Sequence, residues 1–518
     1  MIWPIVPVEG DETGVANGVE SWSRGGTDFK AAAYLYEIQP GSYRMLHALQ
    51  WMTGAQPLQI FGVVTALGAT TFLVLSSLLV AHVLALRAAW VAVVLLTAQE
   101  LTAAAAYANT SAVAGSFAMG ALVLTQRSRS FRGVWCAGVL IGLGGYFRLD
   151  SLLLSPALLA LRLGIAHDPL TRALRTTAVT ALIAAATLLT AFTLSEVSLQ
   201  TAWSAFSNRG SVVTWNPLWV KGWLVLGFVA TVTAWLGLGW LVVRRNWSLL
   251  ALILAGSLPS LAVYGGSFTT PKYLYYAVPF LALPIFDLVR EAWTQTGAWR
   301  TIGRSAALLA VALHLLEGTF GVQTSSEEFR RFIPAPSPAN LLSVQSGPKK
   351  IRVGIGEGEV IPTDDGPRLR GGQLWAPAMW RREKRAMAET LASLDSVLRT
   401  SLPDLIVTSN YLSFRVLDGW LRDHGFTATS TTRFPGDPVS HRTIWRRDHL
   451  ALTTVLLNQS PLENTEFASV SQLGHRALLI SDRGPLGTAH LLGNQVNRWT
   501  LLSEHRHALF ALYLRHPS

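Results

Sequence analysis

A succession of long apolar segments between Leu58 and Leu316 constrains this chain more than any other feature. These segments carry almost no charge, whereas the sequence after Gly318 is dense in Arg, Glu and Asp. A helix needs about 20 apolar residues to cross the roughly 30 Å hydrocarbon core of a bilayer. The sequence therefore predicts a polytopic α-helical membrane protein, with about nine spanning segments at most.

The apolar runs lie at about 58–86, 88–107, 111–125, 133–147, 149–163, 176–194, 222–243, 248–264, 273–288 and 302–316. The fourth and fifth runs are short and meet at Arg148 and Asp150, so we expect either two half-helices or one tight hairpin there. Half of the 518 residues are apolar and 14% are charged, with a mean hydropathy of +0.34, which excludes an ordinary soluble globule.

The arginines of the connections predict the orientation of the helices. They fall on every second connection, at 87, 127–132, 162–175, 244–245 and 290–304, and short connections rich in Lys and Arg face the cytoplasm. Segment 1–57 and everything after Glu317 then face the external side. A chain that starts in the cytoplasm requires a further helix before Met1. We therefore expect a start-site error, a truncation or an N-terminal tail that is translocated on its own.

The net charge of +11 and the single Cys136 exclude several other classes of protein and site. The positive charge is spread over connections and forms no clustered basic stripe, so we expect no nucleic-acid partner. One cysteine allows neither an intramolecular disulfide nor a zinc site built from thiolates.

Composition divides the chain into four parts. We expect an external loop at 1–57, a transmembrane bundle at 58–317, a proline-rich linker at 318–345 and a soluble external α/β domain at 346–518. The last part has expected strands at 350–355, 404–408 and 427–434, and expected helices at 378–399 and 412–424. Its glycine-rich stretch 354–358 lacks the GxGxxG spacing and precedes Pro362, which disfavours a nucleotide site.

The first external segment contains an adjacent carboxylate pair, Asp11 and Glu12. Such a pair next to the membrane is suited to serve as a general base and an electrostatic stabiliser, because each carboxylate raises the pKa of the other. The alternative is a solvated acidic turn, which is common on protein surfaces.

Three stretches carry a resemblance to a known family. They are GDETGVANGVESWSRGG followed by YLYEIQPGSYRMLHALQWMTG, then GVLIGLGGYFRLDSLLLSPALLAL, then FTTPKYLYYAVPFLALP. In this order they resemble the GT-C superfamily of polyprenyl-phosphate-sugar glycosyltransferases, in particular the group of the dolichyl-phosphate-mannose protein mannosyltransferases and the aminoarabinose lipid A transferases. The similarity covers roughly residues 9–290.

The resemblance implies transfer of a sugar from a polyprenyl-phosphate carrier to an acceptor hydroxyl by an inverting route. Asp11, with Glu12 beside it, takes the proton of the acceptor, and the lipid phosphate leaves. A cation held near that phosphate stabilises the charge that it gains. The implied substrate-binding residues are Gln39, Tyr43, Arg44, Arg148, Lys272 and Tyr273. Alternatively, Arg44 is solvated, Lys272 snorkels to the interface and Arg148 pairs with Asp150.

Two departures from the family pattern concern charge. Gln39 stands where many relatives have a basic residue, and the second external turn, 107–111, has no acidic residue. The nearest carboxylate there is Glu100, so a second catalytic carboxylate is in doubt. The sequence shows no clear ligand set for a divalent metal, and no cofactor is predicted with certainty, although a metal stays an open alternative.

The expected partners are a polyprenyl-phosphate sugar, membrane lipids and a lipid, glycan or protein acceptor, at the periplasmic face of a bacterial inner membrane. Two other classes of function stay open. A transporter or flippase of lipid-linked sugar also uses intramembrane charges and broken helices. A non-catalytic membrane scaffold is the third alternative, favoured by the missing acidic residue.

Overall fold

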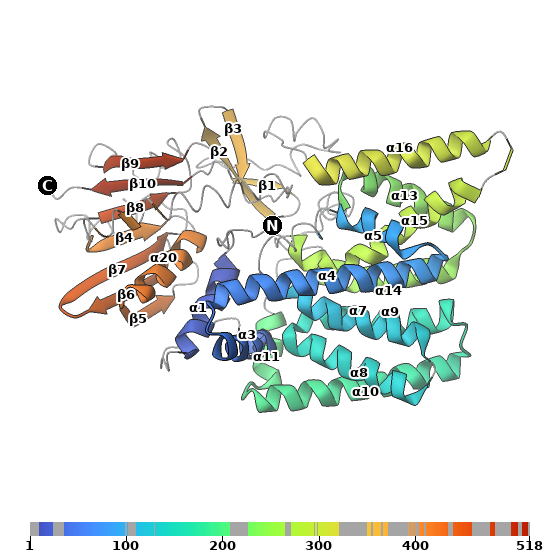
Figure 1. Ribbon diagram of the computed structural model, residues 1–518, viewed down its shortest axis with the longest axis horizontal. Helices are drawn as coiled ribbons and strands as arrows, with labels where there is room; N and C mark the ends of the chain where they lie inside the picture. Colours follow the sequence, from blue (N-terminus) through green and yellow to red (C-terminus); the bar gives the residue numbers. More distant parts are fainter. Residues whose placement is uncertain are drawn as a thin grey trace.

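The structure is a computed structural model. It describes residues 10–23, 36–98, 101, 110–128, 130–207, 226–264, 271–294, 296–297, 299–320, 350–353, 356–363, 366–370, 392, 395–396, 399, 403–408, 411–433, 439–457, 477–481, 499–505 and 510–515. These residues form a mostly helical part with several apolar helices and a C-terminal part with strands and one helix (Figure 1). The expected linker falls almost entirely outside the described residues, and so does Glu100.

The helical part runs from residue 10 to residue 320. Its elements are α1 (Gly10–Ser23), η1 (Tyr36–Ile38), α3 (Pro40–Thr53), α4 (Pro57–Leu84), α5 (Ala88–Leu96), α7 (Ser111–Arg127), α8 (Phe131–Phe147), η2 (Leu149–Leu154), α9 (Pro156–Ala160), η3 (Leu161–Ile165), α10 (Leu170–Leu194), α11 (Leu199–Ser207), α13 (Phe228–Val243), α14 (Trp247–Tyr264), η4 (Pro271–Ala277), α15 (Val278–Thr294) and α16 (Trp299–Phe320).

Two of these helices, α4 and α10, are long and apolar enough to cross a membrane. Helices α8, α13 and α14 contain shorter apolar stretches. Apolar side chains lie on both faces of α4: Phe72 is fully buried, whereas Leu67 is 64% exposed. A helix that is apolar on its outer face as well as its inner face is typical of an apolar solvent.

Segment 1–57, which was predicted from the sequence as an external loop, contains α1, η1 and α3. Val15 and Val19 of α1 pack in one apolar cluster with Tyr43 and Leu46 of α3 and with Ile60 of α4. The spacing of Val15 and Val19 places them on one face of a helix. Burial of that face stabilises helical structure in a segment that otherwise reads as polar.

Of the two arrangements expected for the fourth and fifth apolar runs, the structure shows the tight hairpin, because Arg162 near the end of the fifth run donates to the carbonyl oxygen of Ser128 just before α8. α8 is one continuous helix, and the next run is broken into η2, α9 and η3. Arg148 lies between them in an extended conformation, with φ −166° and ψ 117°. α8 packs closely on α10, since a Cβ at Gly142 would lie 2.6 Å from the carbonyl oxygen of Ala184. Small residues permit such close approach of helices in membranes.

The C-terminal part contains two sheets. β1 (Lys350–Val353), β2 (Gly356–Thr363) and β3 (Gly366–Arg370) form a small antiparallel sheet. The seven-stranded sheet has the order β5-β6-β7-β4-β8-β10-β9 and contains β4 (Leu405–Thr408), β5 (Thr427–Arg433), β6 (Val439–Arg447), β7 (Leu450–Leu457), β8 (Ala477–Ser481), β9 (Trp499–His505) and β10 (Phe510–Arg515).

Helix α20 (Tyr411–Asp423) follows β4 and packs against β4 and β7. β4 pairs in parallel with both β7 and β8, while the other pairs are antiparallel. The expected strands near 404 and 427 and the expected helix near 412 are confirmed by β4, β5 and α20. The glycine-rich stretch 354–358 leads into β2 rather than into a helix, and most of the expected helix 378–399 lies outside the described residues.

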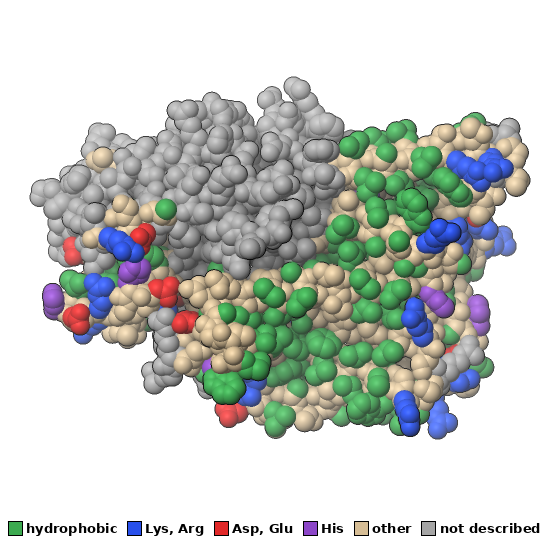
Figure 2. Space-filling model, in the orientation of Figure 1, with side chains coloured by type: hydrophobic (Ala, Val, Ile, Leu, Met, Phe, Trp, Pro, Cys, Tyr) green, Lys and Arg blue, Asp and Glu red, His purple; other side chains and the backbone are tan. Residues whose placement is uncertain are grey.

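Exposed arginines gather at the end of the helical part that lies farthest from the sheets (Figure 2). They are Arg87, Arg127, Arg132, Arg172, Arg175, Arg244, Arg245 and Arg300. All lie on the connections α4–α5, α7–α8, η3–α10, α13–α14 and α15–α16, or in the adjoining helical turns. Hydrophobic side chains cover much of the surface between this end and the opposite end (Figure 2).

Candidate functional site

The N-terminus of α3 packs against the C-terminal end of α8. A Cβ at Gly41 would lie 2.6 Å from Cδ1 of Tyr146 and 3.0 Å from its carbonyl oxygen, so this contact has no space for a side chain. Ser42 donates a hydrogen bond from Oγ to the carbonyl oxygen of Phe147 at 3.1 Å. The contact places Gln39, the N-cap residue of α3, beside Arg148, which follows α8 directly.

A chain of buried hydrogen bonds starts at this contact. Thr110 donates from Oγ1 to Oε1 of Gln39 at 2.7 Å, and a guanidinium nitrogen of Arg148 lies 3.4 Å from the same Thr110 oxygen. The Nε of Arg148 donates to Asp150, with distances of 2.7 and 3.0 Å to the two carboxylate oxygens. Tyr276 of η4 donates from its hydroxyl to Oδ1 of Asp150 at 2.9 Å.

The two charged side chains of this hydrogen-bond chain are largely buried. The side chain of Arg148 is 12% exposed and that of Asp150 is 2% exposed. A charge removed from water is costly unless an opposite charge and hydrogen bonds compensate it. The ion pair that was the alternative reading of Arg148 is confirmed, and it holds the guanidinium in a fixed orientation.

Lys272 and Tyr273 reach the same region through the backbone of η4. Lys272 precedes Tyr276 by four residues, which is about 8 Å along a 3₁₀ helix. Their side chains lie outside what the structure describes. Of the predicted site residues, the structure thus brings together Gln39, Arg148 and the backbone of Lys272 and Tyr273.

A second polar cluster surrounds Arg44. Its Nε donates to the hydroxyl of Tyr36 at 3.2 Å, and that hydroxyl donates to the carbonyl oxygen of Ser195 at 3.1 Å. The hydroxyls of Tyr146 and Ser195 lie 2.7 Å apart. Burial lowers the pKa of Arg44, but the hydrogen bond to Tyr36 and the nearby Glu196 outweigh it, so that the net shift is upward and the guanidinium stays charged.

Tyr43 and the acidic pair occupy other positions. Tyr43 is fully buried in the cluster that α1, α3 and α4 form, and its ring packs edge-on against Tyr36 at 5.7 Å. Asp11 and Glu12 lie in the first turn of α1, not on a loop, and their side chains are outside the described set. A carboxylate in the first helical turn is favoured by the helix dipole.

Several members of these clusters were not among the predicted site residues. They are Tyr36, Thr110, Tyr146, Asp150 and Tyr276. The sequence could have indicated Asp150 as a site residue, because it lies two residues after Arg148 in an apolar region. It could not have indicated Thr110 or Tyr276, since only tertiary structure brings them to Gln39 and Asp150.

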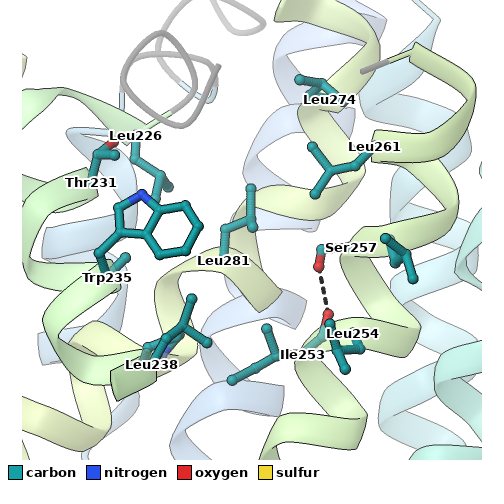
Figure 3. Close-up of a pocket in the computed structure, with 13 residues that line it drawn as sticks. Leu226, Thr231, Trp235, Leu238, Ile253, Leu254, Ser257, Leu261, Leu274 and Leu281 are labelled. Carbon is teal, nitrogen blue, oxygen red and sulfur yellow. Dashed lines mark hydrogen bonds between the residues drawn. The ribbon is translucent and has the colours of Figure 1, made fainter. Parts of the chain in front are cut away.

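An apolar cavity of about 210 Å³ lies between α13, α14, η4 and α15 (Figure 3). Leucine side chains, Trp235 and Ile253 point into it, and Leu274 of η4 lines it two residues before Tyr276. Ser257 also lines it, but its hydroxyl donates to the carbonyl oxygen of Ile253. η4 therefore connects an apolar cavity to the buried polar chain.

No metal site accompanies these features in the described part of the chain. Among the described residues, no three His, Cys, Asp or Glu side chains are close enough together to hold a metal ion. The polar chain around Arg148 contains a guanidinium, the carboxylate of Asp150 paired with it, two hydroxyls and an amide.

Comparisons with known proteins complete the description. No protein-family model and no curated protein matches the chain. Among solved structures, it is similar to the crystal structures of ArnT from Cupriavidus metallidurans in the apo state and bound to undecaprenyl phosphate. Both are 12% identical with a TM-score of 0.49, and the similarity covers 98% of this chain and 93% and 94% of those chains.

Proposed function

We propose that this protein is a GT-C-like membrane glycosyltransferase that moves a sugar from a polyprenyl-phosphate carrier to an acceptor hydroxyl on the external face of a bacterial inner membrane. The observation that carries the proposal is the buried Arg148, held by Asp150 and Thr110 at the point where α3, α8 and η4 meet. The resemblance of three sequence stretches to that family supports it.

The distribution of exposed side chains supports a polytopic bundle in a membrane. Exposed aromatic residues near the arginine-rich end are Trp90 (67%), Phe131 (72%), Trp135 (51%), Trp247 (61%) and Trp293 (46%). Near the opposite end, Trp51 of α3 is 83% exposed and Trp203 of α11 is 63% exposed. Tryptophan gathers at both interfaces of a bilayer, and arginine gathers on the cytoplasmic side.

We infer the side of the membrane that each of the four parts faces from the positive-inside rule. The arginine-rich connections face the cytoplasm, and segment 1–57 and the C-terminal unit 346–518 face the periplasm, with 318–345 as the linker between bundle 58–317 and that unit. The polar chain around Arg148 lies at the end of α8 opposite to Arg132, and so at the periplasmic end. A donor phosphate at the lipid headgroup level reaches it there.

Arg148 is the proposed group that binds the phosphate. When the bond between the sugar and the phosphate breaks, the leaving phosphate gains negative charge, and a fixed cation in a poorly hydrated site stabilises that charge. Asp150 and Tyr276 orient the guanidinium, and Lys272, four residues before Tyr276, is the proposed second cation. Arg44, Gln39, Tyr43 and Tyr273 remain proposed contributors to substrate binding.

Asp11 is the proposed general base. It accepts the proton of the acceptor hydroxyl while the oxygen attacks the anomeric carbon, and the carbon–oxygen bond to phosphate breaks. Glu12 is the proposed electrostatic partner. Their position in the first turn of α1 favours the ionised form that a base requires.

The apolar cavity beside η4 is the proposed entry of the polyprenyl chain into the bundle. Its lining is mostly apolar, and Leu274 of that lining lies in η4, the helix that carries Lys272 and Tyr276. A hydrocarbon chain gains free energy by burial against such a lining. A polyprenyl-phosphate donor has an apolar tail that suits the cavity and a phosphate that suits the neighbouring polar chain around Arg148.

The test uses purified protein in lipid nanodiscs with a panel of radiolabelled polyprenyl-phosphate sugars, and it measures release of polyprenyl phosphate. We expect release by the wild type, a loss of about 10²- to 10⁴-fold in Asp11→Asn, and a loss of about 10²-fold in Arg148→Lys. Arg162→Lys is the matched control, because Arg162 also forms a buried ion pair, with Asp168, and is expected to keep donor turnover. Absence of release by the wild type with every donor would refute the proposal.

A transporter or flippase of lipid-linked sugar is the second candidate, favoured by the broken segment η2–α9–η3, which includes a π-helical turn in η3. Broken helices frequently line substrate paths in transporters. The same nanodisc material distinguishes the two functions. A transporter leaves the donor intact and does not depend on Asp11, whereas a transferase consumes the donor. A scaffold neither consumes the donor nor moves it across the membrane.

A further inference from the structure

Helix α1 lies between the helical part and the C-terminal unit (Figure 1). One face packs on α3 and α4 through Val15 and Val19, which are 2% and 0% exposed. Another face contacts α20, the helix that packs on the seven-stranded sheet. The element that carries Asp11 and Glu12 is thus held from two sides, by two different parts of the chain.

The contact between α1 and α20 contains a buried polar pair. Asn17 donates from Nδ2 to Oδ2 of Asp418 at 3.3 Å, and the two residues are 8% and 6% exposed. A Cβ at Gly419 would lie 3.0 Å from Oδ1 of Asn17, so the backbone of α20 approaches this side chain closely. The Nε of Arg422 lies 3.8 Å from the other oxygen of Asp418.

The two contacts of α1 constrain it in different ways. Apolar packing is not directional and tolerates small shifts along a helix axis. A hydrogen bond between two buried side chains depends strongly on distance and angle, and leaving either group unsatisfied is costly. The Asn17–Asp418 bond therefore restricts the register and the rotation of α1 more than the apolar contacts do.

We propose that Asn17 and Asp418 are positioning residues, through which the C-terminal unit sets the orientation of the helix that carries the general base. The inference rests on the proposed function of Asp11. Asn17 follows Asp11 by six residues, about 9 Å along the axis of one helix. A rotation or a shift of α1 at Asn17 is therefore transmitted directly to Asp11. The C-terminal unit thus has a role in turnover through Asp418 of α20.

A swap of the two side chains tests this assignment. Asn17→Asp alone places two carboxylates in contact, and we expect a turnover number lowered on the order of tenfold, because small displacements of a catalytic group are costly. Asn17→Asp combined with Asp418→Asn restores one donor and one acceptor, and we expect it to recover most of the activity. Asp418→Asn alone keeps an acceptor for Asn17 and is expected to stay near wild type.

The control is Asp423→Asn, which removes an exposed carboxylate from the same helix and is expected to leave turnover unchanged. Affinity for undecaprenyl phosphate, measured by its incorporation with the protein in nanodiscs, is expected to be equal within about twofold in all variants. That split between turnover and binding is the readout that loss of folding would not produce.

A second measurement is independent of activity. In a Cys136→Ser background, Asn17→Cys with Asp418→Cys is expected to be joined by a short thiol crosslinker, with the joined peptides identified by mass spectrometry. Wild-type turnover in Asn17→Asp, no recovery in the swap, or no crosslink would overturn the inference while leaving the proposed function intact. Absence of donor release by the wild type would overturn both, and so the two failures are distinguishable.

Discussion

The hydroxyl of Tyr276 donates a hydrogen bond to the carboxylate of Asp150 at 2.9 Å, although 126 residues separate the two in the sequence. Both side chains are buried, and Asp150 holds Arg148 at the same time. Three helical elements, α8, η2 and η4, are therefore tied together by one carboxylate. The same carboxylate orients the proposed phosphate-binding guanidinium, so stability and function depend on it together.

Removal of Asp150 alone is expected to lower the free energy of unfolding more than removal of both members of the ion pair. Asp150→Leu leaves the guanidinium of Arg148 buried without its carboxylate, which costs about 3 kcal/mol or more. Asp150→Leu with Arg148→Met removes the charge as well and is expected to regain much of that loss. The measurement is the midpoint of thermal unfolding in detergent micelles. A double variant no more stable than Asp150→Leu would contradict this account of the pair.

Gly41→Ala is expected to disturb the junction of α3 and α8. The new Cβ would lie 2.6 Å from the ring of Tyr146 and 3.0 Å from its backbone oxygen, and overpacking of this kind costs about 1 to 3 kcal/mol. Because Gln39 is the N-cap residue of the same helix and accepts a hydrogen bond from Thr110, donor turnover is expected to fall together with the unfolding midpoint.

Gly239→Ala in α13 is the matched control for that change, because a Cβ there meets nothing within 4 Å. It is expected to be neutral or to stabilise by about 0.5 to 1 kcal/mol, since alanine favours a helix over glycine. Equal midpoints for the two variants would show that the tight contact at Gly41 is not energetically important.

The sequence predicted the apolar helices well, because a bilayer-length apolar run is a strong and local signal. The run expected at 58–86 is α4 at Pro57–Leu84, and the run expected at 248–264 is α14 at Trp247–Tyr264. α1 was missed as a helix for a physical reason. Gly10, Gly14 and Gly18 lower its intrinsic helix propensity, and its stability comes from burial against α3, α4 and α20, which no local pattern encodes.

The candidate site was predictable only where its members are close in sequence. Arg148 and Asp150 lie two residues apart, and their pairing was an expected alternative. The partners Thr110, which precedes α7, and Tyr276 in η4 reach the pair from segments 38 and 126 residues away. Such residues are recognised as a site only after packing brings them to a charge.

Acidification is expected to destabilise the contact of α1 with α3 through His47. Burial lowers the pKa of the His47 imidazole, which stacks on Trp22 at 4.5 Å. The folded state therefore binds a proton less readily than the unfolded state, whose imidazole has a pKa of about 6.5. Stability is then retained above that pKa and decreases as the pH falls below it.

Thermal unfolding midpoints measured from pH 8 to pH 5 test this expectation, with His47→Gln beside the wild type. The variant keeps a polar side chain at position 47 but cannot be protonated in this range, so its midpoint is expected to depend less on pH. Identical pH dependence of the two proteins would assign the effect to other groups.

The two ends of the helical part are expected to face opposite sides of the membrane, and labelling of single cysteines tests this directly. In a Cys136→Ser background, Asp423→Cys lies at the exposed end of α20, and Arg127→Cys lies in the last turn of α7 among the exposed arginines. A membrane-impermeant maleimide added to spheroplasts is expected to label position 423 at once and position 127 only after permeabilisation. The reverse pattern would place the C-terminal unit in the cytoplasm, away from any periplasmic acceptor. Labelling of both positions without permeabilisation would show that the exposed arginines do not mark a cytoplasmic face, and the orientation that the positive charges predict would be wrong.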